Sequence, residues 1–405
     1  MLKKAFGCVV LLGIVAARAM TPSAAAQSTI EPPGAKKPVV RSTPRVQPLP
    51  EAQWTDAHRQ LVEKFAGYGK PDNAFKTFLN VPEMVDGVMP YTIYLSMDTS
   101  LMPRHREILI LRAAWLCGNE ALWAQHAPRA RDAGMNNTEI HRIAEGASAA
   151  GWDPFEATLL RMADELYRNS SVTDATWKTL TATYDMQHMM EAVETFNHFT
   201  VLSMLYNSFG VQPENGLPDR LPAGVTYRVA VPKREPALAK ARYEPPAGRG
   251  IAVGRTFAMH PTLSRAWSPR QSFINQHSPL MPRHREMLIL RMGWNCRSEY
   301  EWAQHVGRVG RAREHGLDPR KIAEGPKAEG WEPIERTILT AADELFHDAT
   351  VSDATWNALT SAFDTKWAMS ALFTSSSYRA ISMSLNTYGV QLEQGDERFP
   401  AIASR

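Results

Sequence analysis

The chain has 405 residues, a length that allows two domains. Its formal net charge is only +3, and no segment gathers the basic residues into the stripe that nucleic-acid binding needs. The composition therefore argues against a nucleic-acid partner.

The first 26 residues have the pattern of a secretory signal peptide. Two lysines precede an apolar run over residues 5–17, and small residues lead up to Ala26. The run is too short to span a bilayer comfortably, and no later segment is long and apolar enough to do so. We predict cleavage near Ala26, no integral membrane segment after cleavage, and a periplasmic or secreted protein. An uncleaved anchor is the alternative.

Two parts of the chain repeat each other at a separation of 179 residues. The seven residues from Leu101 to Glu107 return unchanged from Leu280 to Glu286, and the sequence Trp-Ala-Gln-His returns as well. Polar residues recur here beside apolar ones, so the duplicated unit carries a candidate site as well as a scaffold.

The rest of the chain connects or flanks the two repeated units. Residues 27 to about 50 lack an apolar period, and the segment between the units is rich in Pro and Gly. We expect a disordered lead-in with an N-terminal helix at 27–72, a first unit at 73–212, a linker at 213–251, a second unit at 252–391 and a tail at 392–405.

The periodicity inside each unit is helical. Residues 103–116 open with a proline in the first turn and are apolar almost all round, which is typical of a helix buried in a bundle. After a short break, Asn119 and Ser298 are good N-caps, and Ser298 with Glu301 has the spacing of a capping box. Further helices are expected at 153–169, 174–184 and 189–209, with counterparts in the second unit. Strand patterns are nearly absent, so the predicted fold class is all-α.

Each unit has a Glu and a His nineteen residues apart across this break, Glu107 with His126 and Glu286 with His305. Two antiparallel helices joined by a tight turn bring such residues face to face. A carboxylate beside an imidazole fixes its tautomer and raises its pKa, which suits proton transfer near neutral pH. The alternative is structural, with the Glu paired to a neighbouring Arg and the His bonded to backbone carbonyls.

Two cysteines remain after removal of the predicted signal, Cys117 and Cys296, at equivalent positions. An oxidising compartment would favour a disulfide between them. We favour the alternative of two buried small residues, because each stands near a Trp in an apolar run. No metal site is expected: His105 and Glu107 point away from each other on a helix, and the Met-rich run at 186–190 loses most of its potential ligands in the second unit.

The motifs Pro-Arg-His-Arg-Glu, Leu-Ile-Leu-Arg and Trp-Ala-Gln-His, in this order after a Phe…Pro segment, resemble the carboxymuconolactone decarboxylase family, a relative of the alkylhydroperoxidase D-like proteins. The resemblance covers both units and most of the mature chain. It implies two repeated helical bundles of the alkylhydroperoxidase D-like type. It also implies a homo-oligomer, here a trimer of two-repeat chains.

The peroxidase branch of that family uses a C-x-x-C pair at the start of the second helix. Aligned on the Glu and the His of each unit, these cysteines fall on Asn119 and Leu122, and on Ser298 and Glu301. Neither unit keeps the pair, so a thiol-dependent alkylhydroperoxidase or peroxiredoxin-like activity is an alternative only. A non-catalytic oligomeric binding protein is a further alternative.

The decarboxylase branch needs no thiol and no cofactor. The resemblance therefore implies a carbon–carbon lyase that acts on a small carboxylated or lactone-like substrate. His126 and His305 would protonate the dienolate left by loss of carbon dioxide, and Glu107 and Glu286 would tune them. The residues expected to bind the substrate are Arg104, Arg112, Arg283 and Arg291, through its carboxylates, and Trp123 and Trp302, as pocket walls. The alternative for these six is ion pairing or helix capping for the arginines and core packing for the tryptophans.

Overall fold

The computed structural model describes residues 41, 43–225 and 240–401. The predicted signal peptide lies outside these residues. The described part of the chain is helical and contains no strand, which confirms the all-α fold class. No helix in these ranges combines the length and the apolar composition that a membrane span requires.

The helices of the first unit follow α1 (Asp56–Lys64) and a short 3₁₀ turn, η3 (Ala66–Tyr68). They are α2 (Asn73–Phe78), α3 (Pro82–Ile93), α4 (Pro103–Leu116), α5 (Glu120–Asp132), α6 (Asn137–Glu145), α7 (Pro154–Asn169), α8 (Asp174–Thr181) and α9 (Met186–Phe209). The predicted boundary between the last two is wrong by three residues on each side, because Asp185 caps α9 by accepting from the backbone N–H of His188.

The second unit shows the same order of helices. They are α10 (Ala252–Ala258), α11 (Pro261–Ser272), α12 (Pro282–Asn295), α13 (Glu299–Val306), α14 (Pro319–Glu324), α15 (Pro333–Asp348), α16 (Asp353–Ala362) and α17 (Thr365–Tyr388). Apart from α14, each begins at the position equivalent to its counterpart in the first unit. A π-helical turn follows both α3 and α11, at Tyr94–Asp98 and Phe273–His277.

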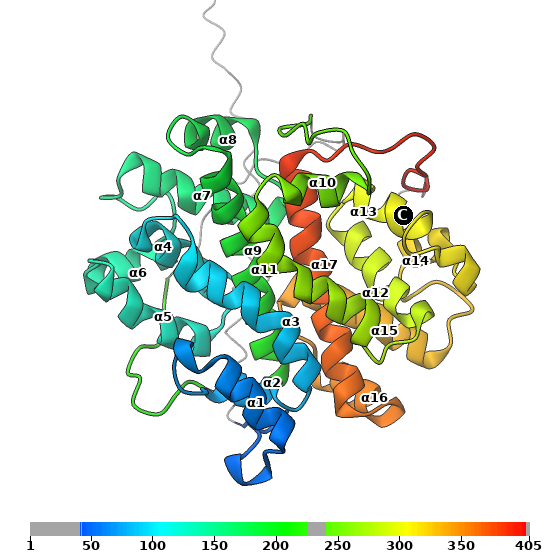
Figure 1. The fold of residues 1–405 in the computed structure, drawn as a ribbon, viewed down its shortest axis with the longest axis horizontal. Coiled ribbons are helices and arrows are strands. Elements are labelled where there is room, and N and C mark those ends of the chain that lie inside the picture. Colours follow the sequence, from blue (N-terminus) through cyan, green and yellow to red (C-terminus); the bar gives the residue numbers. More distant parts are fainter. Residues whose placement is uncertain (1–40, 42, 226–239, 402–405) are drawn as a thin grey trace, which may run out of the picture.

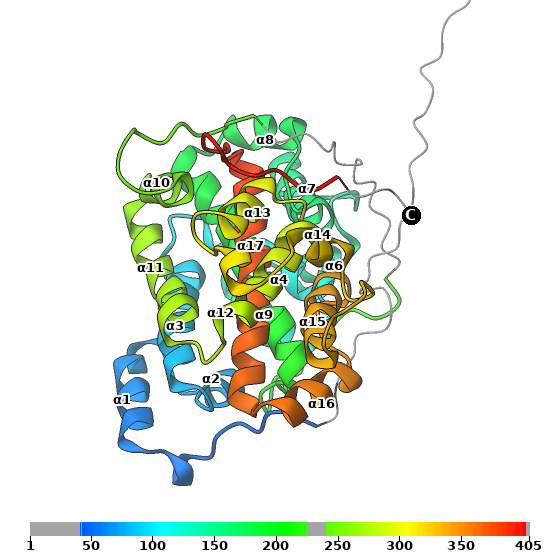
Figure 2. The ribbon, with the colours of Figure 1, turned by 90° about the vertical axis from the view of Figure 1, so that its right-hand side faces the viewer.

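The two longest helices, α9 and α17, pack against each other at the centre of the molecule (Figure 1). Helix α4 covers α9 on one side and α12 covers α17 on the other, so both central helices are buried almost all round. A second pairing joins the units where α3 packs against α11, on one face of the molecule (Figure 2).

Equivalent asparagines tie the units together about this central pair. The Nδ2 of Asn207 donates to the carbonyl of Cys117 in its own unit, at 2.8 Å, and to that of Ala349 in the other, at 3.2 Å. The Nδ2 of Asn386 makes the matching bonds to the carbonyls of Cys296 and Ser170. Buried backbone carbonyls at the helix ends thereby find donors, and the same pairs hold α9 and α17 in register.

The segment leading into each unit crosses to the other unit. Arg45 forms an ion pair with Asp353 at 2.7 Å, and Arg242 forms one with Asp174, also at 2.7 Å. In the first unit α1 and η3 follow this segment and precede α2, whereas in the second unit no helix lies between Arg242 and α10. This insertion gives the first unit a wall that the second unit lacks.

Candidate active site

The structure brings the predicted pair Glu107 and His126 together. Glu107 lies on α4 and His126 on α5, and the Nδ1 of the ring is 2.8 Å from the Oε2 of the carboxylate. Both side chains are buried, and the rings of Phe199 and His126 pack in a T-shaped arrangement with their centroids 5.1 Å apart. Burial lowers the pKa of His126 and outweighs the opposing charge of Glu107.

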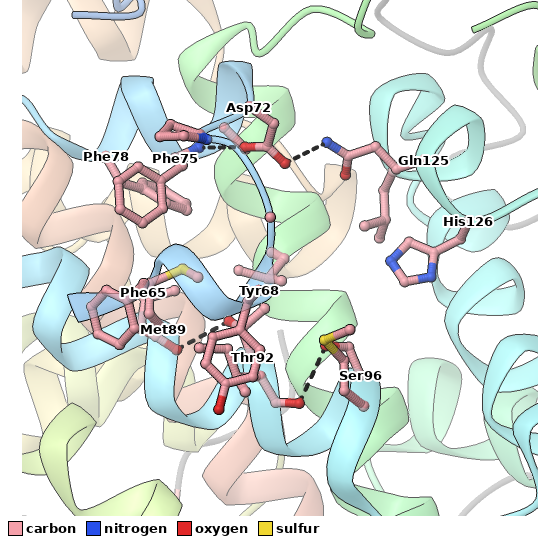
Figure 3. Close-up of a pocket in the computed structure, with 18 of the residues that line it drawn as sticks. Phe65, Tyr68, Asp72, Phe75, Phe78, Met89, Thr92, Ser96, Gln125 and His126 are labelled. Atoms are coloured by element: carbon pink, nitrogen blue, oxygen red, sulfur yellow. Dashed lines mark hydrogen bonds between the residues drawn. The ribbon is translucent and has the colours of Figure 1, made fainter. Parts of the chain in front are cut away.

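A cavity of about 110 Å³ opens beside His126. Figure 3 shows the ring projecting from α5 into this space. Its Nε2 has no hydrogen-bond partner within the described ranges, because the only bond made by the ring uses Nδ1. The apolar walls come from α1, α2, α3, α5 and α9, with Val62, Phe65, Phe75, Phe78, Val88, Met89, Ile93, Leu122, Phe199 and Leu202 among them.

Polar groups gather at the rim of this cavity. Asp72 caps α2 by accepting from the N–H of Phe75 at 2.7 Å, and its second oxygen accepts from the Nε2 of Gln125 at 3.1 Å (Figure 3). Burial raises the pKa of Asp72, although Phe75 and the charge of Arg129 oppose this. Arg129 also borders the cavity, one helical turn after His126.

The imidazole of the equivalent pair in the second unit has a second carboxylate partner. The Nδ1 of His305 lies 2.6 Å from the Oε2 of Glu286, and its Nε2 lies 2.9 Å from the Oε1 of Glu301. Burial by itself would lower the pKa of His305, but the two carboxylates outweigh it and raise the pKa to about 10. Both ring nitrogens are therefore occupied by the protein.

Two substitutions between the units account for this difference. Glu301 stands where the first unit has Leu122, so only the second His gains a second carboxylate. Trp267 stands where the first unit has Val88, and its ring stacks on Phe257 with a centroid separation of 4.5 Å. An indole thus fills the position that borders the cavity in the first unit.

The helix that carries His305 also differs from its counterpart in the first unit, at its start and at its end. The capping box predicted from Ser298 and Glu301 is wrong: the Ser298 side chain makes no cap bond, and the Glu301 carboxylate turns toward His305. Helix α13 then ends at Val306, and Gly310 lies so close that a Cβ there would clash with the carboxylate of Glu286. Asn119, by contrast, caps α5 as predicted.

The four arginines predicted to bind substrate are engaged elsewhere and do not line the cavity. Arg104 pairs with Glu139 and Glu156, and Arg283 with Glu335 and two backbone carbonyls. Arg112 bonds to Asp164 and to the carbonyls of Ile143 and Ala144, and Arg291 repeats this with Asp343, Ile322 and Ala323. Arg112 and Arg291 thereby cap the last turns of α6 and α14, and all four arginines make the ion pairs of the structural alternative.

The predicted tryptophans and the two cysteines are also buried in the core. Trp123 and Trp302 are at most 2 % exposed, and neither lines the cavity. Cys117 and Cys296 are both buried, and the structure has no disulfide between them. Burial raises the pKa of Cys117 to about 12, which opposes formation of a reactive thiolate.

Sequence reasoning missed Asp72, Gln125 and Arg129, the polar residues at the rim. Asp72 precedes the first unit and Arg129 follows the Trp-Ala-Gln-His motif, so neither lies in the motifs that the two units share. A signal was present, however. Comparing the units position by position at Leu122 and Val88 would have shown that they differ at the site.

Comparison with known proteins locates one family in this region. Residues 81–165 match the model of the Carboxymuconolactone decarboxylase family. The matched segment runs from the start of α3 into α7 and includes both Glu107 and His126. No curated protein and no solved structure matches the chain.

Proposed function

We propose that the protein is a cofactor-free lyase of the carboxymuconolactone decarboxylase type, with its working site in the first unit. Its substrate is a small carboxylated or lactone-like compound, and His126 transfers the proton. The observation that carries the proposal is the imidazole of His126, held by Glu107 through Nδ1 while Nε2 borders an open cavity. The family match over the same segment supports the reaction class.

The proton transfer follows from the position of the ring. In the protonated ring, Nδ1–H donates to the carboxylate of Glu107 and Nε2–H faces the cavity. When the carbon–carboxylate bond breaks, its electron pair remains on the substrate as a dienolate, and carbon dioxide leaves. The Nε2 proton then moves to that carbanion and leaves a neutral ring, the form that burial favours.

The second unit serves as a scaffold in this proposal. Since Glu286 and Glu301 occupy both nitrogens of His305, that ring has no free position for a substrate atom. We also propose that the chain arose by tandem duplication, supported by the repeated order of helices. One copy then kept the cavity and the other filled it.

Export and assembly belong to the same proposal. The apolar run and small residues before Gln27 support a periplasmic or secreted location. Met102 and Met281, at equivalent positions before α4 and α12, are 58 % and 54 % exposed and offer an apolar contact for further copies in a trimer. Native mass spectrometry would test the trimer, which a monomer at micromolar concentration would exclude.

The two histidines provide a matched pair of variants for testing the reaction. Release of carbon dioxide from candidate lactone acids would be followed for the parent, His126→Gln and His305→Gln. We expect His126→Gln to lose roughly a hundredfold in kcat/KM, the scale of a removed general acid, with thermal stability close to that of the parent. His305→Gln should keep its specific activity in the folded fraction. Equal activity of His126→Gln and the parent would refute the proposal.

A further inference from the structure

Arg129 is a cation at the rim of the cavity with no partner in the parts of the chain that the structure describes. It lies on the last turns of α5, and its side chain is exposed. No hydrogen bond or ion pair within the described residues engages its guanidinium. The only carboxylate that borders the cavity with it, Asp72, is engaged by the N–H of Phe75 and by Gln125.

The equivalent arginine in the second unit shows the contrast. Arg308 pairs with Asp396 at 2.9 Å and with Glu393 at 3.5 Å, and it also donates to the carbonyl of Gln394. In the first unit the position of Asp396 is taken by Leu217, which has no charge, and that of Glu393 by Glu214, which accepts from the backbone N–H of Asn73. One arginine is thus neutralised by the protein, and the other stays available beside the open cavity.

The interior of the cavity is suited to an apolar body. Behind the rim its walls carry the rings of Phe65, Phe75 and Phe78, and Lys70 and Arg129 are the only cations among the lining residues, both exposed. Thr92, Ser96 and Tyr206 also line the cavity, and the hydroxyls of Thr92 and Ser96 already donate to the carbonyls of Val88 and Ile93. An apolar cavity of about 150 Å³ takes up a benzene ring. The present one, at about 110 Å³ and open at its rim, has room for a ligand of similar size.

We propose that this site selects an apolar, ring-sized monocarboxylate, held by its carboxylate on Arg129 with the ring inside the cavity against Nε2 of His126. A second carboxylate on the far side of the ring would find no lysine or arginine in the interior of the cavity, so its burial there is costly. A neutral ring would lose the charge-assisted bond. Arg129 is therefore a specificity-determining residue. This inference rests on the proposed function for the site but concerns binding rather than turnover.

Calorimetric titration with simple probes tests the inference on the full chain. We expect benzoate to bind at least tenfold more tightly than benzyl alcohol, which lacks the charge, and than terephthalate, which adds a second carboxylate. Arg129→Met should weaken benzoate about tenfold and leave benzyl alcohol unchanged. Arg308→Met, the matched control, should leave the affinity for benzoate within about twofold.

The outcomes separate this inference from the proposed reaction. Terephthalate binding as tightly as benzoate, or benzoate affinity unchanged in Arg129→Met, would overturn the inference even if turnover depended on His126. Conversely, benzoate affinity that depends on Arg129 together with full turnover in His126→Gln would support the anchor and refute the lyase mechanism. Circular dichroism of each variant ensures that weakened binding reflects the site and not unfolding.

Discussion

Replacing His305 by glutamine should destabilise the protein at neutral pH and abolish part of its sensitivity to alkali. The ring lies between the carboxylates of Glu286 and Glu301, at 2.6 and 2.9 Å, and is about as buried as they are. A protonated ring here compensates two carboxylates that have little contact with water. Glutamine keeps the ability to hydrogen-bond but carries no charge.

The magnitude follows from the raised pKa of His305. A pKa of about 10 in the folded chain, against the ordinary 6.5, corresponds to about 5 kcal/mol at roughly 1.36 kcal/mol per pKa unit. Because the pKa is raised, this stabilisation is fully present below pH 6.5, about 4 kcal/mol remains at pH 7, and it is lost as the pH rises through about 10. The lowered pKa of Glu286 describes the same contact from the other side and is not added. Breaking a buried ion pair costs a similar ~3–5 kcal/mol.

Urea denaturation from pH 6 to pH 10 measures this contribution. Between pH 6 and pH 10 the free energy of unfolding of the parent should fall by about 4 kcal/mol more than that of His305→Gln. The two proteins should therefore be about equally stable at pH 10. His126→Gln is the control: burial lowers the pKa of His126, so it should follow the parent between pH 7 and pH 10. If His305→Gln lost as much stability as the parent over that range, the reasoning about the two carboxylates would be wrong.

Three further results are expected. If His126 donates the proton, kcat/KM should fall as the pH rises through a pKa below 6.5, because burial lowers the pKa of that ring; a rate that increases through neutral pH would instead indicate a general base. Simultaneous replacement of Cys117 and Cys296 by alanine should leave activity within a few-fold, with or without reductant, since both thiols are buried and form no disulfide; an inactive variant that still folds would favour thiol chemistry. Arg112→Met should lower the free energy of unfolding, measured by chemical denaturation, by about 3–5 kcal/mol, because it removes the cation that pairs with the buried carboxylate of Asp164. A loss of activity at unchanged stability would instead indicate that Arg112 binds the substrate.

Much of the fold was encoded locally. The apolar run after Pro103, the cap at Asn119 and the absence of strand patterns predicted buried helices joined by a tight break, and the structure has them. The contact between Glu107 and His126 was also predictable, because two antiparallel helices leave few ways to place residues on either side of a short turn. These features depend on a few neighbouring residues and on the 3.6-residue period.

The availability of each site depended on contacts between distant segments. The same Trp-Ala-Gln-His motif contains His126 and His305, yet Glu301 contacts the Nε2 of His305 only, Trp267 replaces Val88, and α1 adds a wall only to the first site. Arg104 and Arg112 resembled substrate ligands because a sequence does not show which carboxylates reach them. By itself the sequence determined the helices and the Glu–His pairs. Tertiary packing decided that His126 faces an open cavity, since the walls of that cavity come from α1, α2, α3 and α9 as well as from the helix that carries the histidine.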